Sequence, residues 1–279
     1  MRPEHRGACE AFGQLLEVMQ RLLAPEGCLW DREQTLQSLK RYLIEEAYEV
    51  VDAIDRNDAA EHKEELGDVL FQIVFQSALR QQEGTFSIEQ VCLDLAEKMR
   101  RRHPHIFADT VVHDVQEVAA NWEKIKQTER SQAGKQRATL EGIPQSMPAL
   151  AAAQKIGERA ASVGFDWPDV VGIQQKLREE VAELDEAIAR GDSRAIAHEL
   201  GDTLLVLTRL ASKLGIQAEE ALRTTNQRFV QRFHTMQQCA ERDGHIFREL
   251  PLEQQNVYWD EAKRIESIST HSAGSEENA

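Results

Sequence analysis

Apolar residues recur along this chain at the three- and four-residue spacing of an amphipathic helix. Two clear stripes are Phe12, Leu15, Leu16 and Met19, and then Val69, Leu70, Ile73 and Val74. No alternation of apolar and polar residues bounded by hairpin turns predicts a strand. We therefore predict an all-α fold, with helices near residues 12–23, 35–56, 59–82, 87–103, 115–129, 149–162, 171–190, 193–214, 218–240 and 252–266.

One pattern occurs twice in the chain. Residues 43–71 read LIEEAYEVVDAIDRNDAAEHKEELGDVLF, and residues 177–205 read LREEVAELDEAIARGDSRAIAHELGDTLL. Aligned without a gap at an offset of 134 positions (177 minus 43), the segments agree at 13 of 29 positions. A further match lies downstream, where Trp122 and Lys126 correspond to Trp259 and Lys263. Because such self-similarity indicates repeated structural units, we predict two tandem helical-bundle repeats.

The boundaries of the two repeats follow from composition. Residues 130–139 are polar, lack apolar periodicity and separate the two copies, as expected of a linker. From Ser267 onward the chain offers almost nothing to bury. We predict an N-terminal helical domain at 1–130, a linker at 131–139, a C-terminal helical domain at 140–266 and a disordered tail at 267–279.

Carboxylates stand out among the shared positions. They are Glu45, Glu46, Glu49, Glu65 and Asp68 in the first copy, and Glu179, Glu180, Glu183, Glu199 and Asp202 in the second. Residues three or four apart share a helix face, and a short polar turn joins the two helices of each copy into an αα-hairpin. The carboxylates then face each other and repel unless a cation lies between them. Oxygen ligands of this kind suit Mg²⁺, with Mn²⁺ as a second candidate.

A plainer interpretation is that these acidic helix faces are simply solvated, which is the commoner case for a single EExxE motif. Here both motifs recur at the same separation of 20 residues (45 to 65, and 179 to 199), which favours a metal site. Gly67 and Gly201 lie inside predicted helices, where glycine costs about 1 kcal/mol relative to alanine. We expect close approach of a neighbouring helix to explain them. A di-iron bundle would use Glu-x-x-His, which none of the nine histidines provides.

The net charge of the chain restricts the kinds of molecule that it is expected to bind. The value of −15, from 48 Asp and Glu against 33 Lys and Arg, opposes binding to nucleic acid or an anionic membrane. It permits a small polyphosphate ligand, provided that divalent cations lie between the two sets of charges. The four cysteines form no CxxC pair, which suggests reduced thiols. Because the N-terminus lacks the apolar stretch of a signal peptide, we expect a cytoplasmic protein.

The chain resembles the MazG family of nucleoside triphosphate pyrophosphohydrolases, in its long two-domain bacterial form. The resemblance covers residues 12–266 and rests on the duplicated carboxylate motifs and on Gly27-Cys-Leu-Trp-Asp31, Arg101-Arg-His-Pro-His105 and Val163-Gly-Phe-Asp-Trp167. It implies hydrolysis of NTPs or dNTPs to the monophosphate and pyrophosphate with Mg²⁺, and a homodimer whose helices complete a bundle. Leu29 stands where the family has proline, and Arg228 where it has lysine.

The resemblance also implies roles for single residues. Glu180, Glu183, Glu199 and Asp202 would bind the metal ion, with Glu46, Glu49, Glu65 and Asp68 as the equivalent set. Glu179 is a candidate base for the attacking water, and a salt-bridged surface glutamate is the equal alternative. The nucleotide-binding candidates are Lys176, Asn226, Arg228, Arg232, Trp259 and Lys263. A solvated lysine and a packing tryptophan are the ordinary interpretations of Lys176 and Trp259.

We predict that the C-terminal copy is the catalytic half, because Asn226 has only Ala96 as its counterpart in the first copy. The first copy keeps its carboxylates, so a structural, regulatory or different catalytic role stays open for it. The implied physiological role is housecleaning of the nucleotide pool or tuning of a stress response. The alternative function is a nucleotide-sensing or partner-binding protein that retains the metal site with little turnover.

Overall fold

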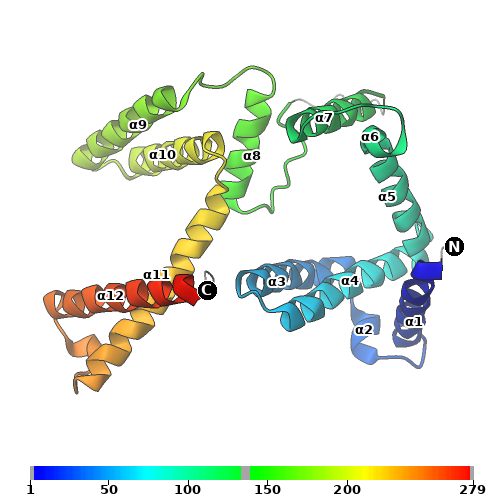
Figure 1. Cartoon of the computed structure of the whole chain (residues 1–279), viewed down its shortest axis with the longest axis horizontal. Coiled ribbons are helices and arrows are strands. Elements are labelled where there is room, and N and C mark those ends of the chain that lie inside the picture. Colours follow the sequence, from blue (N-terminus) through cyan, green and yellow to red (C-terminus); the bar gives the residue numbers. More distant parts are fainter. Residues whose placement is uncertain (1–2, 133–138, 277–279) are drawn as a thin grey trace. The chain divides into compact units, whose positions relative to one another are not determined.

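The computed structural model describes residues 3–132 and 139–276, and within these residues every regular element is helical. All the predicted helices are present, so the all-α prediction is confirmed (Figure 1). Four further elements are too short to show an apolar period. They are the 3-10 helices Pro3–His5 and Phe247–Glu249, α2 (Leu29–Glu33) and α6 (Pro104–Phe107). The chain divides into two compact units, Met1–Gly134 and Lys135–Ala279, which we call unit 1 and unit 2.

Unit 1 is built around an αα-hairpin. Its arms are α3 (Leu36–Asp55) and α4 (Ala59–Gln82), and α1 (Arg6–Leu22) packs against α4. The chain continues through α5 (Ile88–Arg102) to α7 (Val115–Gln132). The core contains one residue from α1, one from α3 and two from α4, all at most 1% exposed: Met19, Leu39, Val74 and Phe75. The apolar stripes of the sequence therefore meet between these three helices.

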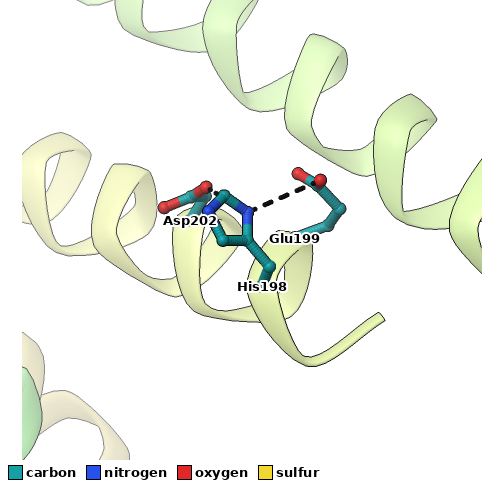
Figure 2. Close-up of side chains that lie close together, drawn as sticks. All are labelled: His198, Glu199 and Asp202. Atoms are coloured by element: carbon teal, nitrogen blue, oxygen red, sulfur yellow. Dashed lines mark ion pairs between the residues drawn. The ribbon is translucent and has the colours of Figure 1, made fainter. Parts of the chain in front are cut away.

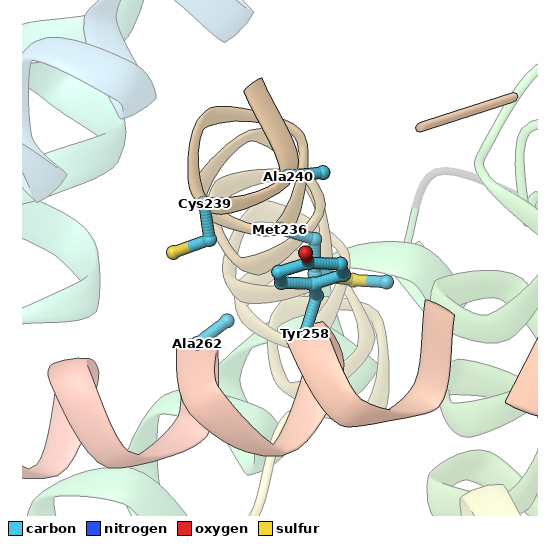
Figure 3. Close-up of a cluster of buried hydrophobic side chains, with 5 residues drawn as sticks. All are labelled: Met236, Cys239, Ala240, Tyr258 and Ala262. Atoms are coloured by element: carbon cyan, nitrogen blue, oxygen red, sulfur yellow. The ribbon is translucent and has the colours of Figure 1, made fainter. Parts of the chain in front are cut away.

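Unit 2 repeats the hairpin. Its arms are α9 (Val170–Arg190) and α10 (Ser193–Lys213), and α8 (Ala149–Ala161) packs against α10. The unit ends in a second pair, α11 (Ala218–Arg242) and α12 (Leu252–Glu276). A separate small core holds this pair together (Figure 3): Met236, Cys239 and Ala240 from α11, and Tyr258 and Ala262 from α12.

The two hairpin turns are built alike. The turn of unit 1 places Asn57 at a φ of 53°, and the turn of unit 2 places Gly191 at a φ of 68°. Glycine and asparagine are the residues that tolerate this left-handed region best. The next residue caps the second arm, because Asp58 and Asp192 each accept two backbone N–H groups of the first helical turn. Both turns direct the second arm back along the first, which sets the carboxylates of the two arms face to face.

Asp166 ties the loop between α8 and α9 to α10. Its carboxylate accepts hydrogen bonds from the Arg209 guanidinium at 2.8 and 2.5 Å and from Lys213 Nζ at 3.0 Å. The Asp166 and Arg209 side chains are only 18% and 12% exposed. The hydrogen bonds from Arg209 and Lys213 lower the pKa of Asp166 to about 2. This loop is thereby fixed against the hairpin of unit 2.

One expectation fails in detail. Among the described residues, nothing lies within 4 Å of a Cβ added at Gly67 or Gly201, and both glycines are exposed. Close helix approach within the chain therefore does not explain them, and that prediction was wrong. Further on, α12 continues to Glu276, ten residues past the predicted domain boundary at 266, because extending an existing helix is far easier than nucleating one.

The ends of the predicted linker are only partly described. Helix α7 continues to Gln132, two residues past the predicted domain boundary at 130, and residues 133–138 lie outside the described part of the chain. The boundaries at 130, 139 and 266 stay predictions. No helix in the described residues combines the length and apolarity that a membrane span requires.

Candidate metal centre

Three carboxylates converge across the hairpin of unit 2. Glu180 and Glu183 extend from α9, Glu199 extends from α10, and one oxygen of each lies within 4.8 Å of the others. The three-residue spacing of the first two puts them on one face of α9, and the hairpin turn brings α10 opposite that face. Glu180 is buried, at 5% exposure. The predicted convergence of these three glutamates is therefore present in the structure.

A lysine neutralises part of this cluster. Lys176 Nζ lies 2.5 Å from Glu179 Oε1 and 2.8 Å from Glu180 Oε1. These hydrogen bonds raise the pKa of Lys176, which keeps it protonated. Burial raises the pKa of Glu183, against the opposing charge of Lys176 and with the added repulsion of Glu180 and Glu199. Glu179 is thus a salt-bridged glutamate here, as the alternative interpretation held, and Lys176 is ion-paired instead of freely solvated.

Asp202 has a different partner. Its Oδ2 lies 3.1 Å from His198 Nδ1, and the same nitrogen lies 3.5 Å from Glu199 Oε1 (Figure 2). Both contacts become ion pairs when His198 is protonated. Glu199 therefore belongs to two groups, one with Glu180 and Glu183 and one with His198 and Asp202. The sequence indicated the aspartate but not the histidine, whose counterpart in the first copy is Glu64.

The cluster recurs in unit 1. Oxygens of Glu46 and Glu49 on α3 and of Glu65 on α4 lie within 4.8 Å of one another. Burial, a hydrogen bond with Glu49 and the charges of Asp68, Glu49 and Glu65 together raise the pKa of Glu46 to about 7. Burial and the charges of Glu49 and Asp68 also raise the pKa of Glu65. One proton or cation shared among these oxygens would relieve their repulsion.

Both clusters fit a hard divalent cation. Their donors are carboxylate oxygens, which Mg²⁺ and Mn²⁺ prefer, and three of them converge in each unit. In unit 2 an ammonium group already lies against one of the three, Glu180, as expected where the local field attracts cations. In unit 1, burial and then the neighbouring carboxylates raise the pKa of Glu46. A site for such an ion requires several oxygen donors that converge, and each cluster provides three.

Five of the six nucleotide-binding candidates lie on α11 and α12, and the sixth, Lys176, lies on α9. Arg232 Nε donates to Glu266 Oε2 at 2.5 Å, and its guanidinium lies 5.6 Å from the ring centre of Trp259. Trp259 also packs against Phe229, with ring centres 5.4 Å apart. Lys263 pairs with Asp260 at 2.7 Å. Asn226 and Arg228 are exposed on α11. Of these five residues, the structure brings Arg232 and Trp259 together.

The same arrangement of cation, acid and tryptophan occurs in unit 1. Arg102 donates to Glu129 at 2.7 and 3.1 Å and lies 5.2 Å from the ring centre of Trp122. Glu129 and Glu266 were missed by sequence reasoning. Each lies seven residues after the repeat tryptophan, on the same helix face, and that shared spacing was the available signal.

A duplicated helical hairpin that carries converging carboxylates defines a class of all-α proteins whose paired helices present clusters of oxygen donors. Within it, the model of the MazG nucleotide pyrophosphohydrolase domain matches this chain twice, at residues 34–107 and 171–236. These ranges contain both carboxylate clusters. The chain belongs to this family, and the predicted resemblance is confirmed.

Two curated relatives match this chain over nearly its whole length. A nucleoside triphosphate pyrophosphohydrolase/pyrophosphatase MazG from Thermotoga maritima is 44% identical over 253 residues, covering 90% of this chain and 95% of the relative. A nucleoside triphosphate pyrophosphohydrolase from Escherichia coli is 42% identical over 256 residues, covering 91% of this chain and 97% of the relative. The crystal structure of a mazG-related protein from Thermotoga maritima is 28% identical and covers 41% of this chain and 98% of its own, at a TM-score of 0.37. The prediction of an enzyme of the pyrophosphohydrolase class is confirmed by the first two.

Proposed function

We propose that the protein hydrolyses NTPs or dNTPs to the nucleoside monophosphate and pyrophosphate, with Mg²⁺ at the carboxylate cluster of unit 2. Convergence of Glu180, Glu183 and Glu199 is the observation that carries the proposal. Family membership supports the reaction type, and the names of the full-length relatives support nucleoside triphosphates as substrates. Attack by water at the α-phosphorus accounts for these products.

Glu180, Glu183, Glu199 and Asp202 would hold the ion, and Mn²⁺ would fit the same donors. When bound, a divalent cation neutralises the triphosphate and lowers the pKa of a coordinated water. Glu179 is the proposed acceptor of the proton from the attacking water, once its pairing with Lys176 is released. Glu46, Glu49, Glu65 and Asp68 form the equivalent set in unit 1.

The remaining residues would bind the nucleotide. Arg228, Arg232 and Lys263 offer positive charge to the triphosphate oxygens, where charge increases as pyrophosphate leaves. Trp259 offers a ring face for the base, and Asn226 offers an amide for the sugar or base. We propose unit 2 as the catalytic half, because the counterpart of Asn226 in unit 1 is Ala96.

We also propose that the protein is a homodimer. Leu200, Leu204 and Leu207 follow helical spacing on α10 and are 49, 45 and 42% exposed. The positions 134 residues earlier on α4 are Leu66, Leu70 and Ile73, which are 50, 38 and 40% exposed. An uncovered apolar stripe that is repeated in both units suits a self-complementary interface, in which the same patch of each copy meets its equivalent.

Ion-exchange chromatography of the products tests the reaction. ATP and dNTPs are incubated with Mg²⁺ and with wild type, Glu180→Gln, Glu46→Gln or the control Glu186→Gln. Glu186 lies on α9 in an exposed pair with Arg190, outside both clusters. We expect monophosphate and pyrophosphate from wild type, from Glu186→Gln and from Glu46→Gln, but none from Glu180→Gln. Loss in Glu46→Gln alone would move catalysis to unit 1, and Mg²⁺-dependent nucleotide binding without turnover would support a sensor.

A further inference from the structure

Lys176 is a charged residue of unit 2 whose equivalent position in unit 1 carries no charge. Its Nζ lies against one exposed and one buried carboxylate, since Glu179 and Glu180 have side chains that are 57% and 7% exposed. Removing water from a carboxylate is costly unless an opposite charge compensates. The ammonium therefore compensates Glu180, which is also a member of the converging cluster.

The repeat supplies an internal comparison. The position 134 residues before Lys176 is Tyr42. The Tyr42 hydroxyl accepts a hydrogen bond from the Arg41 guanidinium, and its ring meets Trp30 edge-on at 5.9 Å. The phenol of Tyr42 is engaged with these neighbours, and it supplies no ammonium to the cluster of Glu46, Glu49 and Glu65. The two clusters thus share their carboxylates and differ in this built-in cation.

We propose that Lys176 is the exchangeable counter-ion of the unit 2 cluster: a divalent cation displaces its ammonium from Glu180, and the released ammonium binds a phosphate oxygen of the substrate. The inference rests on the proposed function, because it assumes that unit 2 binds both ligands. A lysine is suited to this exchange, since its compact charge is carried on a flexible four-carbon stem. Its tip need only rotate away from Glu180.

A consequence is that cation and nucleotide bind cooperatively at unit 2. Without nucleotide, the ammonium and the divalent cation compete for the same oxygens and repel each other. A bound triphosphate offers the ammonium another anionic partner and removes that competition. Thermodynamic linkage requires the effect to be reciprocal, so the cation must also strengthen nucleotide binding. At unit 1 Tyr42 stands in the place of this lysine, so the cation should bind there without nucleotide.

Two binding measurements on the full chain test this exchange. The first is titration with Mn²⁺ followed by electron paramagnetic resonance, in a Glu46→Gln background that weakens the unit 1 cluster. The second is calorimetric titration with α,β-methylene-ATP, which resists cleavage between the α- and β-phosphorus, at saturating Mn²⁺. Wild type, Lys176→Met and Lys176→Arg are compared in both. Methionine keeps much of the side-chain length without charge, and arginine keeps the charge.

We expect Lys176→Met to bind Mn²⁺ about tenfold more tightly in the absence of nucleotide, because a like charge has been removed from the cluster. We expect the same variant to bind the analogue about tenfold more weakly, because a phosphate partner has been lost. Lys176→Arg should stay near wild type in the first titration. These opposite signs separate the proposed exchange from a merely structural role, since a damaged site would weaken both affinities.

Unchanged or weaker Mn²⁺ binding in Lys176→Met would overturn the inference. Failure of the proposed metal site looks different: Mn²⁺ binding to wild type would then be insensitive to Glu180→Gln, with or without nucleotide. Tyr42→Lys in a Glu180→Gln background provides the mirror experiment, with Tyr42→Phe as its control. Without nucleotide, we expect Mn²⁺ to bind the unit 1 cluster more weakly in Tyr42→Lys and unchanged in Tyr42→Phe.

Discussion

Arg232 and Glu266 form an ion pair that joins α11 to α12, with 2.5 Å between Nε and Oε2. Arg102 and Glu129 make the corresponding pair in unit 1, between α5 and α7. In each unit the arginine also faces a tryptophan ring. The glutamate therefore fixes the direction of a guanidinium that would otherwise have several rotamers. A preset arginine loses less conformational freedom when it binds a phosphate.

Glu266→Gln is expected to raise the KM for ATP about fivefold and to change kcat less, because it loosens Arg232 without removing its charge. The pair is only partly buried, with side chains 24 and 34% exposed, so we expect a small change in stability. Steady-state kinetics of Glu266→Gln beside Glu129→Gln provide the measurement. An effect confined to Glu129→Gln would show that unit 1 binds the substrate.

Stability without metal should depend on pH through Glu46. Its pKa rises from 4.5 to about 7 on folding, mainly through burial. The folded chain therefore binds this proton more tightly than the unfolded chain, and the free energy of unfolding rises as pH falls from 7 towards 4.5. Urea unfolding in EDTA, followed by tryptophan fluorescence, measures this dependence.

Glu46→Gln is the control for that experiment, because it removes the titrating group and should flatten the curve in this window. Divalent cation should reverse the trend in wild type, since ionised carboxylates bind it and protonated ones do not. The stabilisation by Mg²⁺ should therefore be larger above pH 7 than near pH 4.5, the reference pKa of glutamate. Identical curves for wild type and Glu46→Gln in EDTA would contradict the assigned cause.

Asp166→Asn should destabilise unit 2 by about 2 kcal/mol, because it leaves Arg209 and Lys213 without their shared, mostly buried carboxylate. The pKa of Asp166 is lowered from 3.8 to about 2. Its contribution is therefore complete above pH 3.8 and is lost as pH falls towards 2. Urea unfolding near neutral pH measures the loss, and Glu186→Gln, in an exposed pair, should change stability by less than about 0.5 kcal/mol.

The long helices could be predicted because several local signals agree. Apolar stripes, the capping aspartates Asp58 and Asp192, and the turn residues Asn57 and Gly191 all mark the same hairpins. The short helices α2 and α6 span five and four residues, which is about one turn and too little for a period. The tail of α12 could not be predicted from burial, since a helix can extend beyond its packed face.

Contacts between distant segments limited what could be inferred about the site. Glu180, Glu183 and Glu199 could be placed together from spacing and one tight turn. The pairing of Arg232 with Glu266 spans 34 residues and depends on how α11 packs against α12, which no local pattern specifies. Lys176 was different, because its three- and four-residue spacing from Glu179 and Glu180 is a standard helix ion pair.

Leu204→Glu is expected to convert the proposed dimer into monomers in sedimentation velocity, because it places a charge in the middle of the uncovered stripe of α10. Leu70→Glu tests the equivalent position on α4. Val115→Glu is the control, since Val115 is 83% exposed at the start of α7 and lies outside both stripes. A variant that stays dimeric would remove its stripe from the interface. If both stay dimeric, neither stripe forms the interface and the proposed dimer surface is wrong.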